Sequence, residues 1–132
     1  MVSTLEIQIL ECSFYDNSCN AIGFIKVLTN YLNTLSEEER NECKKYFKVG
    51  RFTISDLYTL EPTKEGARNH KGLKLIFSLV IDPKKDTVID KAGWQSGIIK
   101  LILNTLDSNR MSILGDPLVI ITDETGDQIR YK

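Results

Sequence analysis

The sequence predicts an α+β fold, a two-layer sandwich in which helices cover one face of a mainly antiparallel sheet. Several short segments alternate apolar with polar residues, which is typical of strands with one buried face. In other segments apolar residues recur at intervals of three, four and seven, as in an amphipathic helix. In chain order these segments give β-α-α-β-β-α-β-β, a pattern that favours one sheet with helices on one side.

The N-terminal third contains a strand and two helices. Residues 4–9 alternate strictly, with Leu5, Ile7 and Ile9 on one face. Residues 21–35 have apolar positions at helical spacing and only a narrow polar stripe. Ser36 and Glu39 have the spacing of a capping box, which predicts a second helix that ends near residue 48.

The remaining elements are a hairpin, a third helix and two short strands. Residues 52–60 and 73–81 predict an antiparallel hairpin around a polar loop at 61–72. The third helix begins after Asp90 or only near Gln95, and its glycines, Gly93 and Gly97, indicate close approach to another backbone. Strands are expected at 118–121 and 128–131, with a turn at 123–126.

Length and charge limit the possible classes of protein. The chain has 132 residues, of which 42% are hydrophobic, so we expect one folded domain over residues 1–132. A net charge of −1 disfavours a general nucleic-acid binder, whose affinity depends on neutralising phosphates. The aromatic residues Phe52, Tyr58 and Phe77 share the apolar face of their strands, so we expect no exposed base-stacking platform.

The cysteines and the absence of targeting patterns indicate a cytoplasmic protein. Cys12, Cys19 and Cys43 form no close pair, so we expect reduced thiols and no zinc site. The sequence has neither a signal-peptide pattern nor an apolar run long enough to span a membrane, and we expect no membrane partner. No phosphate-binding or cofactor motif is present, and the one histidine, His70, lies in a basic polar loop, so we expect no cofactor and no metal.

The leading functional hypothesis is a non-enzymatic protein-binding module. Such a protein would be a small inhibitor, immunity-type or adaptor protein that occludes a partner protein, and no catalytic residues are assigned to it. The supporting feature is the surplus apolar surface of the two long helices, residues 21–35 and the third helix, whose wide apolar arc includes Trp94, Ile99 and Leu103. Apolar surface beyond the needs of a core marks interfaces, so these residues are predicted to bind a partner or a second copy of the chain.

A metal-dependent nuclease is an alternative. The region from Asp56 to about Asp107 resembles restriction-endonuclease-like nucleases, which carry an acidic residue, then an acid-x-Lys sequence that ends a strand, then a helix. The resemblance implies that Asp56 and Asp82 would hold Mg²⁺ and that Lys84 would orient the attacking water. Strand parity counts against it, because without a bulge Asp56 and Asp82 point to opposite faces of the sheet.

A third hypothesis also stays open. An α+β domain of this size can hold a small ligand in a pocket between its helices and its sheet. The sequence alone names no residues for such a pocket.

Overall fold

A computed structural model of the chain describes residues 2–14, 19–48, 51–62, 68–80 and 91–131. The α+β class and the predicted order of the longer elements are confirmed, and two short strands, β2 and β5, are added. The elements are β1 (Val2–Leu10), β2 (Ser13–Phe14), α1 (Ala21–Asn33), α2 (Glu37–Lys48), β3 (Arg51–Pro62), β4 (Arg68–Val80), α3 (Lys91–Ser108), the 3-10 turn η1 (Arg110–Ser112), β5 (Ile113–Leu114), β6 (Leu118–Asp123) and β7 (Gln128–Tyr131).

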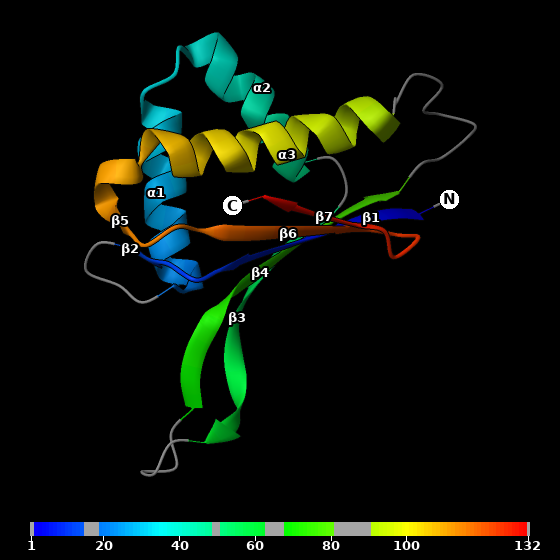
Figure 1. Ribbon diagram of the computed structural model, residues 1–132. Coiled ribbons are helices and arrows are strands. Elements are labelled where there is room, and N and C mark those ends of the chain that lie inside the picture. Colours follow the sequence, from blue (N-terminus) through cyan, green and yellow to red (C-terminus); the bar gives the residue numbers. More distant parts are fainter. Residues whose placement is uncertain (1, 15–18, 49–50, 63–67, 81–90, 132) are drawn as a thin grey trace.

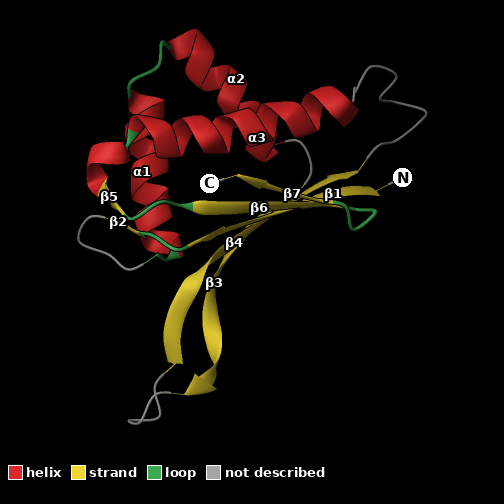
Figure 2. Cartoon of the chain, viewed as in Figure 1, coloured by secondary structure: helices red, strands yellow, loops and turns green. Residues whose placement is uncertain are grey.

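The long strands form one antiparallel sheet in the order β3-β4-β1-β6-β7, and β2 pairs with β5 in a small second sheet. The elements β1, α1, β3, β4, α3 and β6 follow the split β-α-β pattern, in which each helix connects two strands that are not neighbours. All three helices lie on one face of the sheet (Figure 1), and the β3–β4 hairpin extends beyond the other strands (Figure 2).

One apolar core fills the space between the helices and the sheet. The strands contribute residues of a single parity, as the alternation predicts, and α1 and α3 contribute the rest of the buried set. These buried residues include Leu5, Ile7, Ile9, Leu73, Leu75, Phe77, Leu79, Phe24, Val27, Trp94, Ile98 and Ile102. The other face of the sheet is half-buried or exposed and carries an ion pair between Glu6 and Lys74, whose charged atoms are 3.7 Å apart.

The first two helices begin at defined caps. The capping box is confirmed: the Glu39 N–H donates to Ser36 Oγ (3.2 Å), and the Ser36 N–H donates to Glu39 Oε1 (3.3 Å). At α1 the Gly23 N–H donates to the side chain of Asn20 (2.8 Å), the N-cap residue. The Ala21 N–H donates to a carboxylate oxygen of Asp56 on β3 (2.7 Å), which ties this helix end to the sheet.

Two expectations about the hairpin are wrong. The polar loop predicted at 61–72 is largely strand, because β3 extends to Pro62 and β4 begins at Arg68. Strands pair through hydrogen bonds between backbone groups, so β3 and β4 continue to pair beyond the apolar residues from which the hairpin was predicted. Tyr58 is 44% exposed rather than turned to the helices, and a register shift between Leu57 and Tyr58 breaks the parity that placed it there.

Gly97 marks the contact between α3 and α2. A Cβ atom built on Gly97 would overlap the phenol ring of Tyr46 on α2. The close neighbour that the sequence predicted is therefore a side chain and not another backbone. Because Gly97 has no side chain, the ring of Tyr46 can pack directly against α3 at this position.

We expect Gly97→Ala to destabilise the fold by about 1–3 kcal/mol through overpacking, although alanine is the better helix former. In a Tyr46→Ala background the same change should stabilise the fold by up to about 1 kcal/mol, because only helix propensity then remains. Urea denaturation of the four proteins in this double-mutant cycle measures the coupling. Equal effects of Gly97→Ala in both backgrounds would contradict the assigned contact.

Candidate functional site

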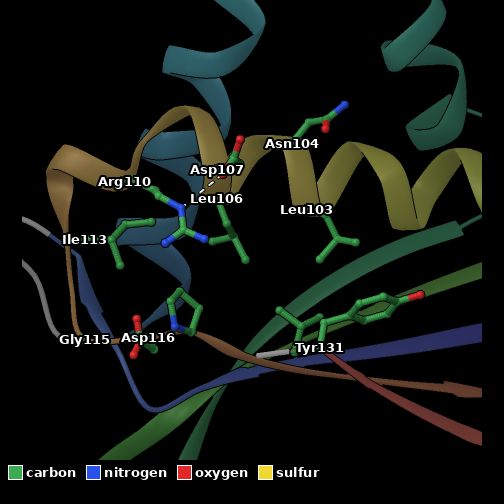
Figure 3. A pocket seen from close by; sticks show the side chains of 11 residues that line it. Leu103, Asn104, Leu106, Asp107, Arg110, Ile113, Gly115, Asp116 and Tyr131 are labelled. Atoms are coloured by element: carbon green, nitrogen blue, oxygen red, sulfur yellow. Dashed lines mark hydrogen bonds and ion pairs between the residues drawn. The ribbon is translucent and has the colours of Figure 1, made fainter.

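A pocket of about 540 Å³ opens between the C-terminal half of α3 and the last strands of the sheet. We call it the α3–β7 pocket. Its lining residues are Leu103, Asn104, Leu106, Asp107, Arg110, Ile113, Gly115, Asp116, Pro117, Val119 and Tyr131. Figure 3 shows Leu103 and Leu106 reaching down from α3, with Tyr131 below them and Arg110, Ile113 and Asp116 on one side.

The upper wall depends on Asn109, a buried amide directly after α3. Its Nδ2 donates to the carbonyls of Thr105 (2.8 Å) and Val27 (2.9 Å), so it closes α3 and fastens it to α1. The Ser112 N–H donates to the Asn109 carbonyl (2.8 Å), which forms the 3-10 turn. Arg110 begins this turn, so the buried amide fixes the position from which the guanidinium reaches the pocket.

The side wall and the floor of the pocket are formed by residues that follow α3, where the chain returns to the sheet. Ile113 lies in β5, which is held by its pairing with Phe14 on β2. Gly115 has a φ of 84°, a left-handed conformation that suits glycine, and it turns the chain toward Asp116 and Pro117. Tyr131 on β7 pairs with Val119 on β6, so the floor is part of the main sheet.

The mouth of the pocket carries charge of both signs. Arg110 Nε donates to Asp107 Oδ1 at 3.1 Å, and the carboxylate of Asp116 lies near the same opening (Figure 3). The side chains of Arg110 and Asp107 are 73% and 75% exposed. An ion pair this exposed contributes less than about 1 kcal/mol, so a ligand can recruit either group at little cost.

The residues predicted for an interface lie in different environments. Trp94 is only 7% exposed and belongs to the core, whereas Ile99 and Leu103 are half-buried and pack against it. Since α1 and α2 both contact α3, they cover much of its wide apolar arc, for which the sequence offered only polar loops. Leu103 forms part of the pocket wall, and an interface through Ile99 and Leu103 remains a prediction.

The residues of the nuclease alternative are not brought together as a site. Asp56 caps α1 from the helix-facing side of β3, and Asp82, Lys84 and His70 fall where the structure describes no side chain. In the part of the chain that is described, no three His, Cys, Asp or Glu residues form a group able to hold a metal ion. Within the same residues, no helix is both long enough and apolar enough to cross a membrane.

Most of the pocket could not be found by pattern. Three of its charged and aromatic residues, Arg110, Asp116 and Tyr131, come from a turn, a connection and an edge strand, and none of these segments has a distinctive sequence pattern. The available signal was the excess of apolar residues near the end of the third helix, which includes Leu103 and Leu106. The structure shows that part of this excess lines a pocket.

Comparisons with known proteins give one structural likeness. No family model matches the chain, and no curated protein sequence matches it. A solved structure of a phage SAM lyase in complex with S-methyl-5′-thioadenosine is similar over 99% of this chain and 89% of that chain, with a TM-score of 0.47 and 10% sequence identity.

This comparison corrects the leading hypothesis. A non-enzymatic protein-binding module was predicted, whereas the similar chain is that of an enzyme, so the module is not carried forward. At this degree of similarity neither a reaction nor a ligand is transferred to the present chain.

Proposed function

We propose that this chain binds a small amphipathic molecule in the α3–β7 pocket. The observation that carries the proposal is the pocket itself, about 540 Å³ with apolar walls and charges of both signs at its mouth. Pockets that hold small molecules range over about 300–1,000 Å³ and combine mostly apolar walls with a few polar groups. The volume of this pocket lies in that range, and apolar atoms make up slightly more of its lining than polar atoms do, which suits a ligand that has both kinds of surface.

The walls define the apolar part of the ligand. Leu103, Leu106, Ile113, Pro117 and Val119 offer carbon atoms, and the ring of Tyr131 offers a flat surface. An aliphatic chain or a single ring suits such walls, because burial of its apolar surface stabilises the complex by about 25 cal/mol per Å².

The mouth defines the head group. The planar guanidinium of Arg110 presents several donors, of which the bond to Asp107 uses the Nε, and it suits a carboxylate. Asp116 and Asp107 accept hydrogen bonds and suit an ammonium group. A zwitterionic head beside an apolar tail, as in a free α-amino acid, satisfies both kinds of group. The proposed ligand class is therefore small zwitterions with an apolar chain or ring.

The test uses four probes and ligand-observed NMR. L-phenylalanine carries both head-group charges, 3-phenylpropionate only the carboxylate, and phenethylamine only the ammonium. S-methyl-5′-thioadenosine, the compound held by the similar phage enzyme, is the fourth probe. We expect L-phenylalanine to bind more tightly than either of its singly charged analogues. Binding of none of the probes, or equal binding of the three phenyl compounds, would contradict the proposed ligand class.

Arg110→Ala should weaken L-phenylalanine binding by up to about fivefold, because an ion pair made by a largely exposed group contributes about 0.2–1 kcal/mol. The fold should be unaffected, since the Arg110 side chain is 73% exposed. Arg51→Ala is the matched control, since Arg51 is an exposed arginine on β3 that does not line the pocket. Titration calorimetry measures the affinity of both variants for L-phenylalanine. Equal losses of affinity would contradict the proposal that the ligand binds in the α3–β7 pocket.

We also propose a cytoplasmic location for the chain. The three cysteines are free thiols, and thiols stay reduced in that compartment.

A further inference from the structure

Two of the three cysteines, among which the sequence showed no obvious pair, meet in the structure. The Sγ atoms of Cys12 and Cys19 are 3.5 Å apart, which corrects the expectation that the chain has no cysteine pair. Cys12 lies between the end of β1 and β2, and Cys19 lies just before α1. Cys19 is 5% exposed, and its Sγ is 3.4 Å from the carbonyl oxygen of Ile9.

The backbone before Cys12 turns sharply. Glu11 has a φ of 62°, a left-handed conformation that a residue with a side chain rarely adopts. This turn lets the chain leave β1 and enter β2 within two residues. Both cysteines are thereby held in place, Cys12 between the turn and β2 and Cys19 by its own burial just before α1, so their contact belongs to the fold.

The contact changes the ionisation of both thiols. The hydrogen bond from Cys12 lowers the pKa of Cys19, and the same hydrogen bond, with burial, raises the pKa of Cys12. The first proton therefore leaves from Cys19, while Cys12 keeps its proton and shares it with the new thiolate. Cys43 differs, because burial and the carboxylates of Glu39 and Glu42 raise its pKa.

Small molecules can reach the pair. A hollow of about 460 Å³ is lined by both cysteines together with Glu11, Ser13, Lys71, Leu114 and Gly115. Lys71 is the cationic residue of this lining, and its side chain is exposed. Thiolate character and access are the two properties that select cysteines for oxidation.

We propose that Cys12 and Cys19 are a modification site at which a hydroperoxide forms an intramolecular disulfide. The Cys19 thiolate attacks one oxygen of hydrogen peroxide, so that an S–O bond forms, the O–O bond breaks, and hydroxide departs. This hydroxide takes the proton of Cys12 and becomes water.

The second step closes the disulfide. The Cys12 thiolate attacks the sulfenic sulfur of Cys19, so that an S–S bond forms and the S–O bond breaks. The hydroxide that leaves takes up the proton released when Cys19 ionised. Two thiols and one peroxide thus give one disulfide and two waters, and a dithiol reductant reverses the change. This proposal stands apart from the ligand proposed for the α3–β7 pocket.

The experiment treats the whole reduced chain with one equivalent of hydrogen peroxide. We expect the intact mass to fall by two hydrogen atoms and the thiol count of the unfolded protein to fall from three to one. Dithiothreitol should restore both values. Peptide mapping should find residues 12 and 19 in one crosslinked fragment. This measurement uses the wild-type chain, so its result does not depend on whether a variant folds.

Two variants locate the reaction. Cys43→Ser should lose the same two hydrogens, whereas Cys12→Ser should lose none and should gain oxygen at Cys19 instead. Addition of oxygen to the wild-type chain without loss of hydrogen, retention of all three thiols, or a dimer linked through Cys43 would each overturn the proposal.

Discussion

Phe77→Ala is expected to cost about 3–5 kcal/mol of the free energy of unfolding, the usual loss when a fully buried phenylalanine is truncated. Phe77 lies on β4 and is 1% exposed. Its ring centroid is 5.0 Å from that of Phe52 on β3 and 5.7 Å from that of Phe47 on α2. The truncation therefore removes the most deeply buried ring of a three-ring cluster and leaves a cavity between α2 and the sheet.

The cluster matters for α2 in particular, because no residue of that helix is fully buried. Phe47 and Tyr46 are its main apolar contacts with the core. We expect the amides of α2 in Phe77→Ala to lose protection from hydrogen exchange before those of α3. Urea denaturation gives the total loss, and Ile22→Ala, at a residue that is 64% exposed, is the control, with an expected change within about 0.5 kcal/mol. A loss below about 1 kcal/mol for Phe77→Ala would contradict this account of the core.

The elements that sequence predicted well are those specified by local chemistry. The alternation of residues 4–9 placed β1 and its buried face, and the spacing of Ser36 and Glu39 placed the start of α2. In each case the residues that carry the signal also make the contact, so no distant part of the chain is needed.

The candidate sites depend on contacts that no local pattern contains. The α3–β7 pocket joins Leu103, Asp116 and Tyr131, which meet only after α3 has docked and β7 has paired. The cysteine pair depends on a left-handed Glu11, a conformation for which glutamate gives no signal. Tyr58 was misplaced for a similar reason, since the register shift that exposes it is a property of two paired strands.

Gly72→Ala should be among the most damaging single-methyl additions to this chain. Gly72 is buried in β4, paired with Leu10 on β1 and with Leu57 on β3. A Cβ built on it would overlap the carbonyl oxygen of Ile9 and crowd the Cδ2 of Leu10 at 2.6 Å. Overpacking against side chains costs about 1–3 kcal/mol. A backbone oxygen within a strand has less freedom to move, so we expect a loss of about 3 kcal/mol or more.

The position explains why glycine is needed. Leu10 is the last residue of β1 that pairs with β4, and on the far side of Gly72 the hairpin extends beyond that strand (Figure 1). Leu10→Ala should relieve only the side-chain part of the overlap, so the double variant should remain less stable than Leu10→Ala alone by about 2 kcal/mol or more. Gly126→Ala is the control for backbone strain without overlap, because Gly126 has a φ of 91° and a Cβ placed there would meet no atom within 4 Å, and it should cost about 1 kcal/mol. Denaturation midpoints that rank Gly72→Ala as no worse than Gly126→Ala would show that β1 and β4 can separate at this point without loss of stability.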